Sequence, residues 1–472
     1  MKKSSAVQSC HKIPWWTGLT VLLVQSFITG VSAEGFRLVK DIYPGYKSSA
    51  VSYMSGDRQL FFWAVDTDGA ASESWTRDPF RGDVFKISNI DDDLYMHMGG
   101  VADLSVGKHQ FFLLRRKSDW GYELWTGTSF GIKKLGNLPD SIDDAQTVSA
   151  LGKYFFVPFS DPDYGKELWV SDGTVAETHR VKDIVPGTGS SSPHDLMEAD
   201  GLLYFMVGDN LWESDGTEAH TRLVRSFKCD TCDSRAHLMA VVHKTLYIKW
   251  SKNINGVGSA ELWRYETVSG QTSRVQSFTN LPQRAYNYAG VGDTLYFLNS
   301  TDMNASHRRY GLWKSNGTSE GTVLVKEWKG QYNIGALTPS DTLLYFHGGN
   351  EDNRELWISN GTSAGTRQVK DISGSPDTGS NLTCLRAFGN TLFFTQTLNG
   401  ISGDFWISDG TEAGTRKTVF GVAASKCPTV VNQQFYFYGN DKTSDVDKGY
   451  GGELYTYDTG GSLPAIITYL LD

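Results

Sequence analysis

The segment Glu355–Ile372, ELWISNGTSAGTRQVKDI, decides the fold because most of it recurs along the chain. Residues 167–184 read ELWVSDGTVAETHRVKDI, and residues 404–419 read DFWISDGTEAGTRKTV. A recurring segment either forms the same chemical site many times or is a structural building block whose function arises only when the copies assemble. The residue types at the recurring positions, considered below, favour the building block.

Two independent markers count the repeats. The Trp of E-L-W occurs eight times, at Trp75, Trp125, Trp169, Trp212, Trp263, Trp313, Trp357 and Trp406, with Tyr455 as a ninth, altered copy, and the spacings are 43 to 51 residues. An aromatic-rich triplet such as Leu392-Phe393-Phe394 also occurs nine times, in step with the Trp. Units of this length with four short strands are typical of propeller blades. We predict an all-β fold, a β-propeller of four-stranded blades with nine repeat units: nine blades, or eight plus a degenerate unit.

The strands of one unit can be read directly from residues 381–420. LTCLRAF, TLFFTQT, DFWIS and TRKTVF are four predicted strands separated by turn residues. Near the N-terminus, FRLVKDIYPG (36–45) matches the fourth strand of a unit but precedes the first complete unit. We expect it to pair into the last blade and close the ring. The segment AIITYLL (465–471) competes for that place, so the sequence leaves the outermost strand open.

The turn of the repeat holds either aspartate or asparagine before its glycine, at Asp172, Asp215, Asn316, Asn360 and Asp409. Both residues tolerate a left-handed backbone, and both accept backbone hydrogen bonds through a side-chain oxygen. Their interchange indicates that the turn needs these two properties and not the charge. We therefore interpret these residues as a hairpin device and not as repeated metal ligands or catalytic acids.

An acid two residues before the Trp recurs as well, at Glu73, Glu123, Glu167, Glu261, Glu355, Asp404 and Glu453. One reading is an acidic girdle that binds cations. The favoured reading is a cross-strand pair with the recurring base of the fourth strand, as at Lys182, Arg225, Lys326 or Lys370.

The N-terminal segment predicts export. Basic residues precede a mostly apolar run at 18–31, and Val31-Ser32-Ala33 offers small residues for cleavage after Ala33. We expect residues 1–33 to be a signal peptide and 34–472 to form a single propeller domain, secreted or at the cell surface, with no transmembrane span after cleavage; a retained signal anchor is the alternative. Residues 1–33 hold three lysines and no acid, so the remaining net charge is −12 and not −9. Such an acidic surface disfavours nucleic acid and anionic membranes as partners.

Four cysteines follow the predicted signal peptide: Cys229, Cys232, Cys384 and Cys427. An even number in an exported chain indicates disulfides. Cys229 and Cys232 are close enough in sequence to form a local loop, which would pair Cys384 with Cys427, but three connectivities are open. A redox C-x-x-C needs a thioredoxin-like context, which the strand pattern does not provide.

The motif E-L-W-x-S-D-G-T-x-x-G-T-x-x-V-K-D-I resembles the ELWxxDGT repeat of exported and surface proteins, mainly of bacteria. The resemblance covers roughly Phe36 to the C-terminus and is strongest at 167–187, 311–326, 355–372 and 404–415. It implies a propeller-like β fold and no defined activity. The turn is also similar to the Asp-box of sialidases, but there the Trp follows the turn, whereas Trp406 precedes Asp409 here.

Other candidate sites are less specific. The carboxylate-rich loops at 66–69 and 161–165 begin like calcium loops but lack the remaining ligands, so calcium stays a possibility and no cofactor is predicted. The ten His residues show no ligand spacing, and no nucleophile or phosphate motif is present. N-x-S/T sequons mark possible glycosylation at Asn299, Asn304, Asn316, Asn360 and Asn381, with Asn299 and Asn304 placed in a long loop.

The predicted function is a secreted or surface-associated propeller that acts as a binding or scaffold module for an extracellular protein or glycan, with no evident catalysis. The loops 299–310 and 439–452 are the expected specificity elements, because loops on a rigid scaffold carry recognition. The alternative is a carbohydrate-active, sialidase-like propeller enzyme, which needs arginines and carboxylates gathered around the axis.

Overall fold

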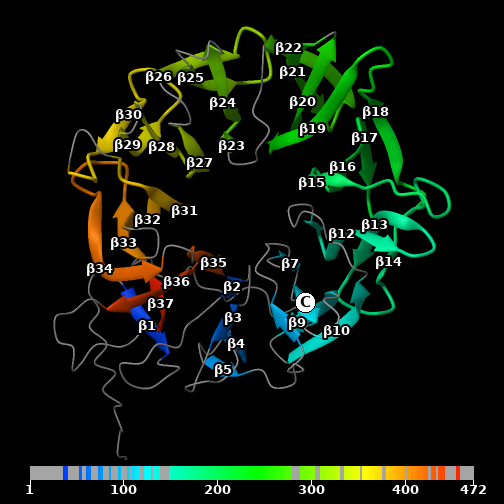
Figure 1. The fold of residues 1–472 in the computed structure, drawn as a ribbon, viewed down its shortest axis with the longest axis horizontal. Coiled ribbons are helices and arrows are strands. Elements are labelled where there is room, and N and C mark those ends of the chain that lie inside the picture. Colours follow the sequence, from blue (N-terminus) through cyan, green and yellow to red (C-terminus); the bar gives the residue numbers. More distant parts are fainter. Residues whose placement is uncertain are drawn as a thin grey trace, which may run out of the picture.

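A computed structural model describes most of the chain (Figure 1). The described residues are 36–40, 53–55, 60–64, 73–77, 84–86, 94–96, 104–106, 109–116, 118, 122–128, 131–138, 148–254, 256–278, 287–302, 309–329, 334–350, 353–374, 379–398, 402–423, 427–431, 434–441 and 453–457. They contain strands and turns and no α-helix. The predicted all-β fold is confirmed.

The described strands form nine antiparallel four-stranded units, called blades 1 to 9 in chain order. Blade 1 contains β2 (Tyr53–Ser55), β3 (Phe61–Ala64), β4 (Glu73–Arg77) and β5 (Val84–Lys86). Blade 2 contains β7 (Leu104–Val106), β8 (His109–Arg116), β9 (Tyr122–Thr128) and β10 (Gly131–Leu138), and β6 (Leu94–Met96) also pairs with β8. Blade 3 contains β11 (Ser149–Leu151), β12 (Tyr154–Asp161), β13 (Gly165–Ser171) and β14 (His179–Arg180).

Blade 4 contains β15 (His194–Ala199), β16 (Leu202–Val207), β17 (Asn210–Ser214) and β18 (Arg222–Ser226). Blade 5 contains β19 (Asp233–Val242), β20 (Thr245–Ile254), β21 (Val257–Glu266) and β22 (Gln271–Phe278). Blade 6 contains β23 (Tyr288–Val291), β24 (Thr294–Asp302), β25 (Arg309–Ser315) and β26 (Val323–Lys329).

Blade 7 contains β27 (Gly335–Pro339), β28 (Leu344–Asn350), β29 (Asn353–Ser359) and β30 (Arg367–Lys370). Blade 8 contains β31 (Leu382–Phe388), β32 (Thr391–Leu398), β33 (Ser402–Ser408) and β34 (Arg416–Ala423). Blade 9 contains β35 (Thr429–Val431), β36 (Gln434–Asp441), β37 (Glu453–Tyr457) and β1 (Phe36–Lys40). Blades 8 and 9 share one eight-stranded sheet because β34 also pairs with β36.

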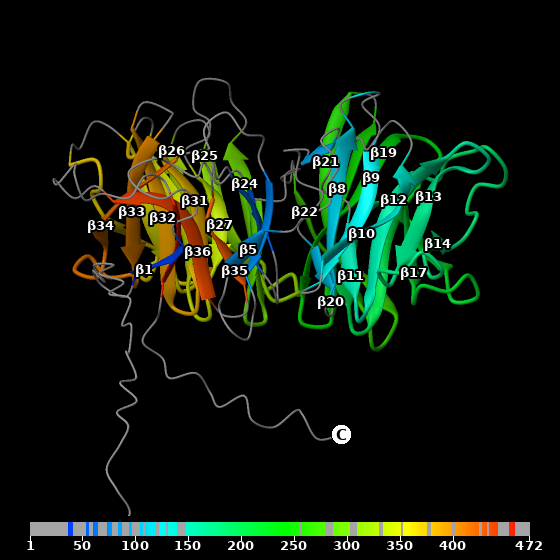
Figure 2. The same cartoon turned by 90° about the horizontal axis from the view of Figure 1, so that it is seen from below.

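The blades follow one another around a ring, with the first strand of each blade nearest the axis and the fourth strand outermost (Figure 1). Seen from the side, the blades stand next to one another with their strands running from one face of the ring to the other (Figure 2). The ring is closed by the N-terminal strand: β1 pairs with β37, and Phe36 lies opposite Tyr457. This pairing answers the question that the sequence left open, while residues 465–471 lie outside the described residues.

The two sequence markers are direct neighbours in each blade. The central aromatic residues of the second strand lie across from the Trp of the third strand, so that Phe346 pairs with Trp357 and their ring centroids are 6.4 Å apart in a stacked arrangement. The same stacked pair occurs in four further blades, as Phe62–Trp75, Phe205–Trp212, Phe297–Trp313 and Phe394–Trp406. The markers recur in step because they are two halves of one cross-strand contact.

The hydrophobic core is divided into layers between neighbouring blades. Leu344 and Phe346 of blade 7 pack with Leu298 and Leu312 of blade 6. Equivalent layers lie between blades 3 and 4, 4 and 5, 5 and 6, 7 and 8, and 8 and 9. The layer at the closure contains Phe62 of blade 1 with residues of blade 9. Burying both faces of a blade therefore requires a neighbour on each side, which a closed ring supplies.

Two disulfides are present, Cys229–Cys232 and Cys384–Cys427. The second joins the first strand of blade 8 to the segment just before the first strand of blade 9. Within the described part of the chain, no helix is long and apolar enough to cross a membrane.

Candidate functional site

The recurring turn is held by the same hydrogen bonds whether it contains aspartate or asparagine. Asp409 Oδ1 accepts hydrogen bonds from the backbone N–H and the hydroxyl of Thr411, at 2.8 and 2.7 Å. Asn360 Oδ1 accepts the same pair from Thr362, at 3.0 and 2.7 Å. The turns at Asp172, Asp215 and Asn316 repeat the pattern. Because an amide oxygen replaces a carboxylate oxygen with no change of partners, the turn uses the acceptor and not the charge.

The turn also docks on the preceding blade. Lys370 of blade 7 donates a hydrogen bond to the carbonyl oxygen of Thr415 at the end of the blade 8 turn, at 2.9 Å. Gly410 in this turn has a φ of +85°, and a Cβ added to it would lie 3.1 Å from the Tyr345 hydroxyl of blade 7. Lys182 and Lys326 reach Thr221 and Thr366 of their own next blades in the same way. The two ends of the motif thus meet across each of these blade boundaries, and the motif is a joint between blades.

The acids before the Trp are also engaged by the protein itself, in two ways. In blades 2, 5 and 8 they form ion pairs: Glu123 with Lys134 at 2.5 Å, Glu261 with Lys252 at 2.9 Å, and Asp404 with Lys417 at 2.6 Å. In blades 3 and 7 the acid instead accepts backbone N–H groups, and Glu355 accepts that of Ile372 at 2.9 Å. The side chains of Glu73 and Glu453 lie outside the described residues.

The predicted pairing of these acids with a base of the fourth strand is found in blades 2, 5 and 8, where the bases are Lys134, Arg274 and Lys417. The four bases named for it were wrong. Lys182, Lys326 and Lys370 bind carbonyl oxygens of the next blade, and Arg225 lies 4.9 Å above the ring of Trp263 in the next blade. The physical reason is strand register. Lys326 and Lys370 lie opposite the Leu of the motif and so on the other sheet face from the acid, whereas Lys134 and Lys417 lie opposite the Trp, on the same face as the acid. Burial raises the pKa of Glu261, but hydrogen bonds from Lys252 and Trp263 outweigh it and hold that pKa below its usual value.

Some of the loops and sequons that were predicted to be accessible are buried or held in turns, and others lie outside the described residues. Asn299 lies in β24 and is only 5% exposed, so it is unsuited to carry a glycan, in contrast to its predicted loop position. Asn316 and Asn360 use their side-chain oxygens inside the turn, whereas Asn381 is exposed. The loop 161–165 is a tight turn in which Asp161 accepts the N–H of Asp163 at 2.8 Å. Asn304, the loop 66–69 and residues 442–452 lie outside the described residues.

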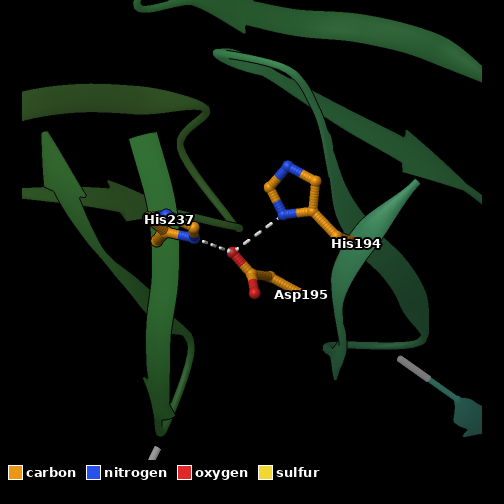
Figure 3. Close-up of side chains that lie close together, drawn as sticks. All are labelled: His194, Asp195 and His237. Atoms are coloured by element: carbon orange, nitrogen blue, oxygen red, sulfur yellow. Dashed lines mark hydrogen bonds and ion pairs between the residues drawn. The ribbon is translucent and has the colours of Figure 1, made fainter. Parts of the chain in front are cut away.

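One polar cluster departs from the repeat, on the first strands of blades 4 and 5. His194 and Asp195 lie on β15, and His237 lies on β19 (Figure 3). The Nδ1–H groups of both imidazoles donate to the same oxygen, Asp195 Oδ2, at 3.1 Å from His194 and 2.9 Å from His237. The Leu238 backbone N–H also donates to this oxygen, at 3.2 Å. The side chains are 26 to 39% exposed, so solvent reaches the cluster.

The repeat and a β-bulge explain why these three residues meet. His194 pairs with Met206 and His237 with Lys249, and these partners each follow the aromatic triplet of their blade, so the two His residues stand at equivalent positions. The register shifts after His194, and Asp195 has a φ of +53°. A bulge re-aims a side chain, and here Asp195 is turned toward blade 5, where it meets His237 (Figure 3).

This cluster was not predicted from the sequence, because its two His residues are too far apart in the chain to show a short ligand spacing. A usable signal was present: His194 and His237 are 43 residues apart, which is also the distance between Tyr204 and Tyr247, the middle residues of the aromatic triplets of blades 4 and 5. Two His residues one repeat apart must lie side by side on neighbouring first strands once the blades form a ring.

The electrostatics of the cluster favour an ionised Asp195. Burial raises the pKa of Asp195, but the hydrogen bonds from His194 and His237 outweigh it and bring that pKa to about 2. Burial raises the pKa of Tyr288, on the first strand of blade 6, to about 12, and the negative charge of Asp195 adds to this rise. The arrangement thus combines two imidazoles and one carboxylate, the donor set that borderline divalent metals prefer.

No protein-family model matches the chain, and no curated protein matches it. Among solved structures, the computationally designed Ika8 protein is 12% identical, with 77% of this chain and 98% of that chain covered and a TM-score of 0.45. The β-propeller domain of the Trilobed protease from Pyrococcus furiosus is 10% identical, with 88% and 96% covered and a TM-score of 0.35. An oligogalacturonate lyase in complex with manganese is 11% identical, with 75% and 98% covered and a TM-score of 0.39. These likenesses extend to the fold alone.

Proposed function

We propose that the protein is an exported binding or scaffold module, secreted or held at the cell surface, whose ligand is an extracellular protein or glycan. The observation that carries the proposal is the internal use of the repeated polar residues. The described carboxylates and turn side chains of the motif hold turns together or form ion pairs within their blades, and the motif's lysines join neighbouring blades. A motif used in this way builds a rigid ring and leaves recognition to residues that do not repeat.

Export is supported by two features. The N-terminal 33 residues have the charge and apolar pattern of a signal peptide. The two disulfides fit an oxidising compartment, since disulfides rarely persist in a reducing cytosol. The ELWxxDGT-like repeat agrees with the same assignment.

The carbohydrate-active enzyme remains the competing function, but no observation favours it. It needs arginines and carboxylates around the axis. The arginine–carboxylate pairs that the structure describes lie on the outer three strands of the blades or next to them, as for Arg222–Glu213 at 2.6 Å and Arg309–Glu327 at 2.8 Å.

A glycan array probed with the purified exported chain tests the proposal, with released sugars analysed from the same wells. Binding without release supports a glycan-binding module, and release of sugar overturns the proposal in favour of the enzyme. If neither occurs, cross-linking on the surface of the source cells should capture a protein partner, and the absence of any partner there contradicts a binding role. Amide hydrogen exchange then locates the ligand: protection at first strands and their loops is expected, and protection confined to fourth strands contradicts a site near the axis.

A further inference from the structure

We propose that His194, Asp195 and His237 form a binding site for a divalent transition metal, with Zn²⁺ as the preferred ion. This site goes beyond the binding role proposed above and does not depend on it. Three features of the cluster support a metal site: the identity of the three side chains, the distances between their ligand atoms, and their partial exposure.

The donor set fits zinc better than calcium or magnesium. Zinc takes imidazole nitrogen together with carboxylate oxygen, whereas calcium and magnesium prefer oxygen ligands alone. Two neutral imidazoles and one carboxylate carry a net charge of −1, which a dication complements. Three protein ligands leave at least one coordination position for water or for an atom of a bound ligand, as in open zinc sites.

The distances fit a shared cation as well. Metal–ligand bonds of about 2.1 Å place neighbouring ligand atoms about 3 to 3.4 Å apart around a metal. The Nδ1 atoms of His194 and His237 already lie 3.1 and 2.9 Å from Asp195 Oδ2, and one ligand atom from each residue lies within 4.8 Å of the others. Small rotations of the side chains suffice to close the three atoms on an ion. Each neutral imidazole would then carry its proton on Nε2 and present Nδ1 to the metal.

The surroundings of the cluster support a built site. The Leu238 N–H holds the carboxylate oxygen from the blade 5 side, which is the kind of outer contact that orients metal ligands. The side chains are about one third exposed, so an ion can enter from solution. The ligands come from two blades, so a bound metal would join blades 4 and 5 at their first strands.

Two asparagine variants separate metal binding from hydrogen bonding. In His194→Asn and His237→Asn, the amide nitrogen lies close to the place of Nδ1 and still donates to Asp195, but no imidazole remains. The matched control is His220→Ala. The His220 Nδ1 lies 2.9 Å from Asp215 Oδ2 on an exposed turn, so it repeats one His–carboxylate contact without a second imidazole.

The experiment titrates the full exported chain, freed of metal by a chelator, with zinc chloride by calorimetry. We expect one Zn²⁺ per chain with a micromolar or lower Kd, at least tenfold weaker binding in both asparagine variants, and unchanged binding in His220→Ala. Zinc should raise the melting temperature of the wild type and the control but not of the asparagine variants. Cobalt should give an absorption band of nitrogen and oxygen ligation in the wild type and in the control, but not in the asparagine variants.

Two results overturn the proposal. One is the absence of stoichiometric zinc binding to the wild type, which would leave the cluster as a hydrogen-bonded clasp between blades 4 and 5. The other is zinc binding of unchanged affinity in both asparagine variants, which would place the ion elsewhere. Melting curves of the metal-free variants verify that they are folded, and a variant that is unfolded without metal is replaced by Asp195→Asn, for which the same loss of binding is expected.

Discussion

At the scale of single residues, the repeat shows which positions tolerate different chemistry. The position after the aromatic triplet holds Met206 in blade 4, Lys249 in blade 5, Leu298 in blade 6, His347 in blade 7 and Thr395 in blade 8. Burial, together with the positive charge of Arg354, lowers the pKa of His347 to about 4. An added Cβ at Gly335 would lie 2.8 Å from its Nε2, so the first strand passes closely over the ring.

This buried imidazole predicts a specific pH dependence. Its pKa in the folded state lies below the usual value of 6.5, so the unfolded chain binds more protons between pH 6.5 and 4. Stability is therefore lost as the pH falls through this window, by about 2 to 3 kcal/mol at its lower end. We expect His347→Met, which introduces the residue of blade 4, to remove this part of the loss. Urea unfolding at pH 7 and pH 4.5 measures it, and equal losses in the two proteins contradict the prediction.

The residues that could be predicted from sequence are those whose partners are local. The exchange of Asp409 for Asn360 at equivalent places identified the turn correctly, because every partner lies within a few residues. The partner of Lys370 was wrong and the cluster around Asp195 was missed, because both depend on how one blade is placed against the next. Sequence periodicity gives the content of a blade but not the contacts across its boundary.

At the scale of the strands, the fourth strand and the following turn should act as one joint. Replacing Lys370 with methionine keeps the apolar stem but leaves the Thr415 carbonyl oxygen, in a fully buried residue, without this donor. We expect a loss of about 1.5 to 3 kcal/mol in the free energy of unfolding, as for a hydrogen bond that involves a charged group. The control is Lys133→Met on β10, where the side chain is exposed. Chemical denaturation measures both, and equal stabilities of the two variants would show that the joint adds nothing.

The four strands of a unit were predictable because aromatic and β-branched runs alternate with Gly, Asn and Asp. The predicted strand LTCLRAF coincides with β31 (Leu382–Phe388), and DFWIS lies within β33 (Ser402–Ser408). Where a strand differs from its predicted length, the burial of its residues explains the difference. The expected specificity loop at 299–310 is shortened because β24 continues to Asp302 and takes Asn299 into the sheet.

At the scale of the whole molecule, closure depends on segments from opposite ends of the chain. β1 pairs with β37, and Val39 of β1 packs against the layer that joins blades 9 and 1. Arg77 of blade 1 donates to the Tyr436 hydroxyl of blade 9 at 2.7 Å and to Gln434 Oε1 at 3.0 Å. The sequence predicted that residues 36–45 supply a fourth strand to the last blade, and the pairing of β1 with β37 confirms this.

Replacing residues 36–40 with a Gly/Ser segment of equal length, with the rest of the sequence unchanged, should therefore remove the fourth strand of blade 9. The variant loses the backbone hydrogen bonds of β1 and leaves β37 as an exposed edge, so we expect a loss of about 3 kcal/mol and a lower melting temperature. A synthetic peptide FRLVKDI should restore part of the loss by adding a strand to that edge, whereas a scrambled peptide should not. Unchanged melting of the variant, or equal rescue by both peptides, would show that β1 does not hold the ring closed.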